Sequence, residues 1–391
     1  MVPFSQGLFL SGVCMKTEIC ERLGIEFPIF AFSHCRDVVA AVSRAGGLGV
    51  LGAVAYSPEQ LELELKWIDE HVDGKPYGVD TVIPAKYIGK DQGDITKEQL
   101  DQMITPAHRK WINDLLDRNG VPPLPDDVEE IEGLLGWSAS GGRAHFEVAM
   151  KHPIALIANA LGPPPEDIIS QAHDKGVLVA ALCGTVRQAI KQKTAGVDIV
   201  IASGYEAGGH TGEIGTMVLL PQVVDAVAPT PVLGAGGIGS GRQMAAAMAM
   251  GAAGVWTGSI WLATEESDSI PSLVDKLLVA DSTQTVRSRC ISGKPARQLK
   301  TDYTRAWDED PECPGYLPMP LQFMATAEAT QRITRFAQSG AEGSAALLGT
   351  PVGQVVGQIN TRKPARQVIE EMVSEYIDAV ERVSGLLSED D

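Results

Sequence analysis

The sequence predicts an α/β protein built on a (β/α)8 TIM barrel, with a helical insertion after the third strand and a C-terminal capping region. Three observations predict this fold. Short apolar runs alternate with helical patterns, eight such runs occur before residue 260, and most end in a polar or glycine-rich turn. The alternation is typical of a parallel sheet with crossover helices. Eight repeats in strict alternation favour a closed barrel over an open sheet.

The predicted strands are short and apolar, as expected of strands that are covered on both faces. They span residues 28–33, 47–53, 77–83, 154–160, 177–182, 198–203, 231–237 and 253–259. The opening stretch of 14 residues has no basic segment and no sustained apolar run, so we do not interpret it as a signal peptide. Ordered structure is expected from about residue 16, and the barrel is assigned to residues 16–263.

Two helical patterns interrupt the rhythm between the third and fourth strands, at about residues 89–140. The first pattern offers a capping box from Thr96 to Gln99. The second offers a Thr105 cap followed by Pro106, and it stops at Gly120. We therefore interpret this segment as an inserted pair of helices.

The chain after the eighth strand is too irregular to continue the barrel. Residues 264–362 are predicted to cap the barrel mouth and to contribute to substrate binding. Residues 363–391 form a helical pattern whose apolar stripe is expected to pack back on the barrel. The stripe comprises Val368, Ile369, Met372, Val373, Tyr376, Ile377, Val380 and Val383.

Charge and cysteine content narrow the class of partner. The chain has 32 Lys and Arg against 50 Asp and Glu, a formal net charge of -18. Such a field disfavours nucleic acid and anionic membrane surfaces, so we expect a small-molecule partner, while a homo-oligomer is compatible with the sequence. The six cysteines lack zinc-site spacing, which predicts reduced thiols in a cytoplasmic protein and no metal.

The strand ends are where a barrel of this kind carries its chemistry. Of the seven histidines, only His34 and His210 follow predicted strand ends. His210 lies in GYEAGGHTGEIG after the sixth strand, where Gly208 and Gly209 would let a flat ligand lie against the backbone. A histidine there can accept or donate a proton. The other five histidines are interpreted as structural.

Glycine-rich turns follow the seventh and eighth strands, in LGAGGIGSG and TGS. Their backbone N–H groups can surround an anion, and a helix beginning near Ser240 would add its dipole. Because this is the usual phosphate position in such barrels, a phosphate-bearing ligand is predicted. Close packing of an alanine-rich helix is the competing explanation.

The combination resembles the nitronate monooxygenase family, FMN-dependent barrels that also include enoyl reductases and quinone reductases. The matching stretches are LGIEFPI, AVSRAGGLGVLGA, KPYGVD, GYEAGGHTGEIGTMVLLPQVVDAV, PVLGAGGI and MGAAGVWTGS, which cover most of residues 23–259. The resemblance implies that His210 is the catalytic histidine. It also implies an FMN site at Phe32, Ser33, Asp80, Gly208, Gly209, Gly236, Gly237, Gly258 and Ser259.

Two positions depart from the family pattern. The loop after the first strand reads AFSHCRD where the family usually has a turn like APMAG, so His34 and Cys35 become candidates for the substrate side of the flavin. Asp80 stands where an amide is common. A carboxylate near the ring would disfavour an anionic reduced flavin.

Four functions fit these residues. The first is oxidation of a nitronate, or of another acidic carbon compound, by O₂ with FMN as cofactor and His210 as base. The second is reduction of an enoyl thioester or quinone, with NAD(P)H as co-substrate and His210 as proton donor. The third is a flavin-free lyase that binds a phosphorylated substrate, and the fourth is a non-catalytic flavin-binding role.

Overall fold

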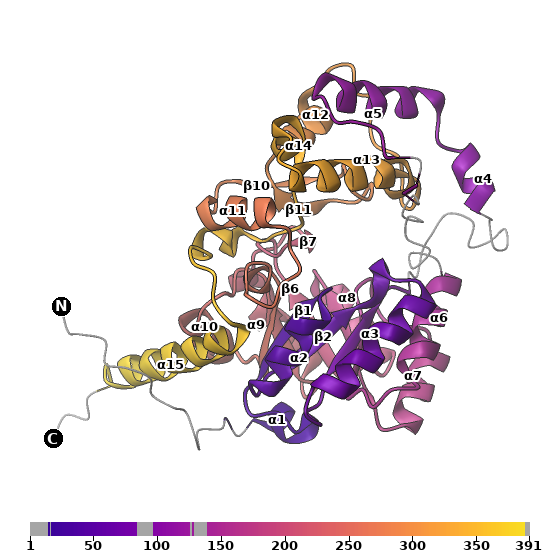
Figure 1. Cartoon of the computed structure of the whole chain (residues 1–391). Helices are drawn as coiled ribbons and strands as arrows, with labels where there is room; N and C mark the ends of the chain where they lie inside the picture. Colours follow the sequence, from indigo (N-terminus) through magenta and orange to yellow (C-terminus); the bar gives the residue numbers. More distant parts are fainter. Residues whose placement is uncertain (1–14, 16, 84–96, 126, 129–138, 388–391) are drawn as a thin grey trace.

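The computed structural model describes residues 15, 17–83, 97–125, 127–128 and 139–387. A barrel with its surrounding helices forms one layer of the molecule, and a mainly helical cap lies over one end of it (Figure 1). Helix α1 (Glu18–Leu23) closes the opposite end, where Ile19, Cys20 and Leu23 pack into the barrel interior.

Eight parallel strands form a closed barrel in the order β1-β2-β3-β4-β5-β6-β8-β9, with β9 pairing to β1. This confirms the predicted (β/α)8 fold, and every strand lies within its predicted range or within one residue of it. The strands are β1 (Ile29–Ser33), β2 (Leu48–Gly52), β3 (Gly78–Thr81), β4 (Leu156–Asn159), β5 (Leu178–Cys183), β6 (Ile199–Ser203), β8 (Val232–Ala235) and β9 (Gly254–Thr257).

The helices between the strands form the outer layer of the barrel (Figure 1). They are α2 (Arg36–Arg44), α3 (Pro58–His71), α6 (Ala139–Ala149), α7 (Glu166–Asp174), α8 (Val186–Thr194), α9 (Thr216–Val227) and α10 (Gly241–Ala249), with single turns η1 (Ala53–Ala55) after β2 and η3 (Ser259–Trp261) after β9.

Alternation along each strand decides which side chains reach the barrel interior. Phe30, Val50 and Ala158 belong to the interior cluster, whereas Leu51 and Val79 pack under the outer helices. At the cap-facing end the same alternation continues, so the last inward positions of the strands form the floor of the barrel mouth.

The cap is built from residues after β9 and from the insertion. It comprises α11 (Pro271–Val279), β10 (Thr285–Ser288), β11 (Ala296–Leu299), α12 (Asp302–Glu309), α13 (Leu321–Gln338), α14 (Glu342–Leu347) and η4 (Gln354–Gln358). The inserted helices are α4 (Lys97–Gln102) and α5 (Pro106–Arg118). The side chain of Thr105 caps α5, and Gly120 follows it with φ 62°, as the sequence predicts; Thr96 lies outside the described residues.

The insertion shares a hydrophobic core with the cap. The rings of Trp111 and Trp307 meet edge to face with centroids 4.5 Å apart. Arg332 of α13 donates hydrogen bonds to the carbonyls of Val121 and Pro122, each at 2.8 Å. Two segments that the sequence treats separately are therefore packed into one unit above the barrel (Figure 1).

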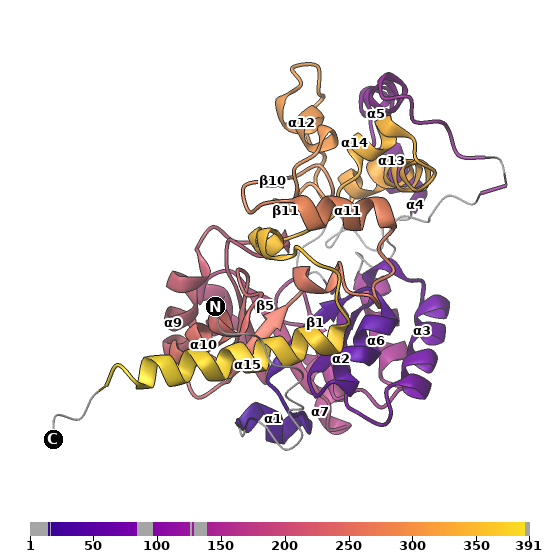
Figure 2. The same ribbon diagram turned by 60° about the vertical axis from the view of Figure 1, so that its left-hand side comes forward.

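Helix α15 (Ala365–Ser384) lies across α10 and α2 on the outside of the barrel (Figure 2). Ile369, Met372 and Val373 of the predicted apolar stripe are buried. Val380 and Val383 at its C-terminal end are exposed. None of the helices in the described part of the chain is long and apolar enough to span a membrane.

Candidate active site at the barrel mouth

The loop that joins β6 to α9 is held in place from both ends. The Glu206 carboxylate accepts hydrogen bonds from the backbone N–H and the hydroxyl of Thr216, both at 2.9 Å, and so caps the start of α9. The Glu206 carbonyl accepts the N–H of Gln354 in η4 at 2.9 Å. Glu206 therefore has a structural role, and it fixes the loop that carries His210.

Gly208 and Gly209 have different roles, although they are neighbours. A Cβ on Gly208 would lie 2.8 Å from the nitrogen of Gly353 and 2.9 Å from backbone atoms of Val352. A side chain at Gly208 would thus collide with the cap, although the residue itself is exposed, and the contact of Gly208 with a flat ligand stays a prediction. Gly209 has φ 75° and nothing within 4 Å of an added Cβ, so a side chain at Gly209 would extend into open space.

His210 lies on the short strand β7 (Gly209–His210), which pairs with β11 of the cap. Its Nε2 lies 2.7 Å from the Ser292 hydroxyl oxygen. The Ser292 hydroxyl can donate to the Lys294 carbonyl at 3.4 Å. Burial, with a further contribution from the positive charge of Lys294, lowers the pKa of His210 to about 4. The imidazole is therefore neutral at physiological pH.

Lys294 brings a cation close to this histidine. Its side chain is half-buried, and desolvation lowers its pKa. Among the described residues no carboxylate forms an ion pair with it. Sequence reasoning missed both Ser292 and Lys294, because they lie between β10 and β11 in the stretch interpreted as irregular.

A glycine turn follows β8 at the barrel mouth. Gly236 and Gly237 both have left-handed backbone conformations, with φ 88° and 70°. A Cβ on Gly236 would meet Ala207 at 3.0 Å, so this turn packs directly against the loop that carries His210. Within the described chain the N–H groups of Gly237 and Ile238 make no hydrogen bond. Successive backbone N–H groups that a turn presents together can form a concave anion site.

The turn after β9 lies beside the same region. The Ser259 hydroxyl accepts the N–H of Gly353 at 2.8 Å, which ties the cap to the barrel. A Cβ on Gly258 would have only Phe32 within 4 Å, at 3.9 Å. By contrast, the N–H of Gly241 at the start of α10 is bonded to the Glu375 carboxylate at 3.0 Å. The Gly241 N–H at the start of α10 is therefore already paired within the chain.

The end of β1 places Phe32 and His34 at the mouth. Phe32 stacks on Trp256 with ring centroids 6.1 Å apart and meets His34 edge to face at 5.1 Å. The Nδ1 of His34 lies 2.9 Å from the carbonyl of Gly52. Because a carbonyl only accepts, Nδ1 carries the proton and the lone pair lies on Nε2. Desolvation of the imidazole by the groups around it lowers the pKa of His34, although the residue is partly exposed to solvent.

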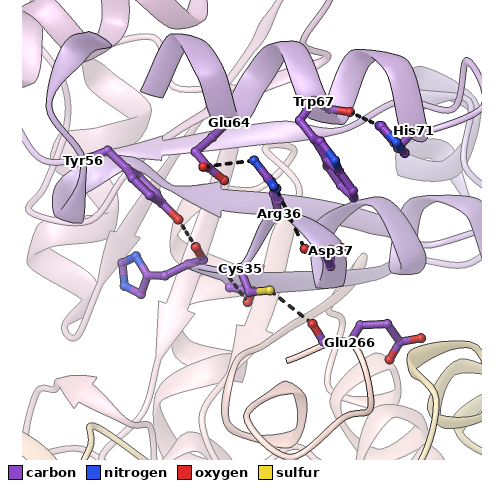
Figure 3. A network of polar contacts seen from close by, with 10 residues as sticks. Cys35, Arg36, Asp37, Tyr56, Glu64, Trp67, His71 and Glu266 are labelled. Atoms are coloured by element: carbon purple, nitrogen blue, oxygen red, sulfur yellow. Dashed lines mark hydrogen bonds and ion pairs between the residues drawn. The ribbon is translucent and has the colours of Figure 1, made fainter. Parts of the chain in front are cut away.

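Cys35 lies apart from these groups. It belongs to the cluster under the outer helices, and its thiol donates to the Glu266 carbonyl at 3.2 Å (Figure 3). Burial raises the pKa of this thiol. The Ser33 hydroxyl accepts the N–H of Cys35 at 3.1 Å and so supports the turn. Among the two substrate-side candidates, the structure places His34 at the mouth and turns Cys35 away from it.

Asp80 is the last inward-facing residue of β3. It is 5% exposed, and its Oδ1 has no hydrogen-bond partner. Burial alone raises the pKa of the carboxyl group to about 8. The described residues contain no cluster of three or more side chains suited to a metal ion.

The glycine turns, the unpaired N–H groups and the orphaned Asp80 carboxyl fit a ligand that has both a phosphate and a hydrogen-bonding ring. The same end of the barrel thus combines an anion site, a neutral histidine beside a cation, and a buried acid. This arrangement can bind a phosphate-bearing cofactor and move a proton.

Comparisons with known proteins agree with this geometry. A family model described as nitronate monooxygenase matches residues 16–375. A Mycobacterium tuberculosis protein named "Putative monooxygenase" is 53% identical over 374 residues, which is 95% of this chain and 100% of that protein. A Staphylococcus saprophyticus protein named "Probable nitronate monooxygenase" is 30% identical over 330 residues, which is 80% of this chain and 86% of that protein.

Solved structures give the same result. Nitroalkane oxidase from Streptomyces ansochromogenes aligns with a TM-score of 0.76 and 25% identity, over 93% of this chain and 99% of that one. FabK from Thermotoga maritima aligns with a TM-score of 0.68 and 27% identity, over 95% and 100%. The chain is therefore an oxidoreductase that belongs to the nitronate monooxygenase family.

Proposed function

We propose that the protein is an FMN-dependent oxidoreductase that oxidises a nitronate, or a similar acidic carbon compound, with O₂. The observation that carries the proposal is that the neutral His210 and the Lys294 cation lie on the same edge as glycine turns whose N–H groups are unpaired in the described chain. When bound, FMN supplies the two-electron chemistry that couples substrate oxidation to O₂ reduction.

The anion site is suited to the FMN phosphate. Gly236, Gly237 and Ile238 would hold it through backbone contacts, with Gly258 and Ser259 alongside. Backbone N–H groups are neutral, so they can bind the phosphate without a Lys or Arg side chain beside it. Phe32 and Gly209 would border the ring, because Phe32 is half-buried at the end of β1 and an added Cβ on Gly209 would meet nothing within 4 Å.

Where the substrate is a neutral carbon acid, His210 would accept its carbon-bound proton; a nitronate has already lost that proton. If Nε2–H donates to Ser292 and the Ser292 hydroxyl donates to the Lys294 carbonyl, the lone pair of the imidazole is on Nδ1. Ser292 thus orients the base. Lys294 would attract the negative charge of a nitronate or of the carbanion formed on proton loss, because no carboxylate of the described chain neutralises it.

The cofactor is tested by colour and by release. The purified protein should be yellow and should release FMN on denaturation, since the barrel mouth offers one phosphate cradle. Stoichiometric FAD would contradict the cofactor assignment, and a colourless protein that cannot be loaded with FMN would favour a flavin-free lyase.

The reaction is tested by anaerobic mixing with a nitronate, NADH or NADPH. Bleaching of the flavin by the nitronate, followed by recovery with O₂, is the expected result. Rapid bleaching by NADH or NADPH alone would instead favour an NAD(P)H-dependent reductase acting on an enoyl thioester or quinone. Full FMN content without bleaching by any donor would leave only a binding role.

Lys294 gives a sharper test of substrate charge. Lys294→Gln should raise the KM for an anionic nitronate about tenfold and leave the KM for a neutral quinone unchanged, because only the anion gains from the cation. Lys300→Gln, at an exposed position beyond β11, is the matched control. Equal effects on both substrates would remove Lys294 from substrate binding.

A further inference from the structure

Asp80 is held in a position that does not suit an ionised carboxylate. In register, it pairs with Gly52 on β2 and with Ala158 on β4. Ala158 belongs to the interior cluster of the barrel, so Asp80 also points inward, level with residues that fill the barrel. Its side chain is 5% exposed. A charge there has lost most of its contact with water.

No group in the described chain compensates that loss. Oδ1 has no hydrogen-bond donor, and no Lys, Arg or histidine forms an ion pair with the carboxyl group. An ionised carboxylate that is buried without donors or a counter-charge is costly, and the usual outcome is that the group takes up a proton. Protonation also converts an acceptor-only side chain into one with an O–H donor.

The residues beside Asp80 indicate what its O–H could donate to. Gly52 has no side chain, and an added Cβ there would lie 2.6 Å from the ring of His34 and 2.9 Å from that of Phe32. Asp80 therefore lies one strand away from the two aromatic side chains at the mouth. A planar ring bound over this floor would have hydrogen-bond acceptors within reach of β3.

We propose that the carboxyl group of Asp80 is kept in its neutral form and donates a hydrogen bond to the flavin ring at the barrel mouth. The proposal rests on the proposed function for the identity of the acceptor, although the protonation state of Asp80 can be measured without it. In this role the acid replaces an amide as donor, and the chain avoids a negative charge beside a flavin that gains electrons.

Titration of Asp80 should be distinguishable from that of its neighbours. On the elements packed against β3, the titratable or charged groups among the described residues are His34 above Gly52, and Arg143, His145 and Glu147 on α6. His145 bonds the Tyr56 carbonyl at 2.9 Å, Arg143 forms an ion pair with Asp167, and Glu147 is exposed. The pKa of each histidine is lowered by burial, so neither changes charge above pH 7. Burial raises the pKa of Asp80 to about 8.

The first experiment measures the proton directly. Protein labelled with ¹³C at the aspartate carboxyls is titrated by NMR, with and without FMN. One resonance should titrate near pH 8 and should be missing in Asp80→Asn. If every aspartate resonance titrates below about pH 6, the proposal is overturned.

The second experiment measures the bond to the cofactor. Asp80→Asn keeps a neutral donor, so its FMN dissociation constant at pH 6.5 should lie within about threefold of wild type. Asp80→Leu removes the donor and should weaken FMN binding about tenfold. If Asp80→Leu does not fold, wild type and Asp80→Asn still test the proposal. Above pH 8, the FMN affinity of wild type should fall below that of Asp80→Asn, because only wild type loses its donor.

The reduction potential of bound FMN provides a readout independent of turnover. An ionised carboxylate near the ring disfavours added electrons, so the potential of wild type should fall below that of Asp80→Asn as the pH rises through 8. Identical potentials from pH 6 to 10, with FMN bound in both, would refute the donor role while leaving the proposed function intact. A protein that never binds FMN would refute both, even if the NMR titration near pH 8 remained.

Discussion

One edge of the barrel mouth presents mainly backbone groups, and the other presents mainly side chains. The edge formed by β6, β8 and β9 offers glycine turns with left-handed φ and unpaired N–H groups. The loop after β6 adds His210 to this edge, and the cap adds Lys294. The edge formed by β1 to β3 offers side chains instead, with Phe32, His34 and Asp80 around Gly52.

Under the proposed function, this difference would let an acidic chain bind an anionic cofactor and still control its ring. The phosphate is assigned to neutral backbone groups, which need no basic side chains. The ring is assigned to an edge whose titratable groups are both kept uncharged near neutral pH by burial. Variants on the two edges should therefore fail in different ways.

The largest effect is expected at the histidine beside the glycine edge. His210→Asn should retain FMN and slow the proton-transfer half-reaction by about 10²-fold or more, because an amide cannot accept a proton near neutral pH. His34→Asn is the matched control and should slow it far less. Single-turnover bleaching with a neutral carbon acid measures this step, since a preformed nitronate has already lost its proton.

The pH profile of that step adds a second check on His210. Its pKa is lowered to about 4, so the base is already deprotonated above pH 5 and the rate of this step should not rise around pH 6.5. A rise centred near pH 6.5, or equal losses in the asparagine variants of His210 and His34, would contradict the assigned role.

The next largest effect concerns the anion site. Gly237→Ala should weaken FMN binding at least tenfold, because a side chain at φ 70° strains the turn that presents the N–H groups. Gly176→Ala is the control, since Gly176 has φ 73°, open space around it and no part in the mouth. Both variants should lose about 1–2 kcal/mol of stability. Equal FMN affinity in the two would place the phosphate elsewhere.

The sequence predicted the barrel and its strands because eight apolar runs in alternation with helices leave few other folds. It also located His210 and the glycine turns, because strand ends are where barrel chemistry lies. It could not show that Gly208 accommodates Gly353, or that Ser292 and Lys294 approach His210. These contacts join residues about 80 to 150 positions apart, and no local pattern records them. For the same reason, the burial of Asp80 and the outward turn of Cys35 emerged only from the fold.

A smaller effect is expected at the loop after β1. His34→Ala should change the ratio of nitronate-dependent to NAD(P)H-dependent activity a few-fold, because its imidazole lies at the mouth beside Phe32. Cys35→Ala should leave that ratio unchanged, because its thiol faces the Glu266 carbonyl. Parallel assays of both activities decide the matter. If Cys35→Ala alters the ratio more than His34→Ala does, the placing of the two residues is wrong.

The smallest effect on turnover, but a clear one on stability, is expected from Asp80→Asn at the β1–β3 edge. The pKa of Asp80 is raised by burial from an ordinary value near 4 to about 8, so the folded state holds a proton that the unfolded state releases. Unfolding free energy should therefore be unaffected by this group below pH 4, fall between pH 4 and 8 by about 1.4 kcal/mol per pH unit at most, and level off above pH 8.

Asparagine does not titrate, so the stability of Asp80→Asn relative to wild type should grow across that window. Urea unfolding of the FMN-free proteins at several pH values measures the difference. Asp281→Asn is the control, because Asp281 is exposed and hydrogen bonds from Thr283 hold its pKa below the usual range, so it is ionised in both states above pH 5. A constant difference in unfolding free energy between wild type and Asp80→Asn from pH 4 to 8 would mean that Asp80 is already ionised in the folded protein over this range. The β1–β3 edge would then carry a charge, and the contrast with the glycine turns of the other edge would be wrong.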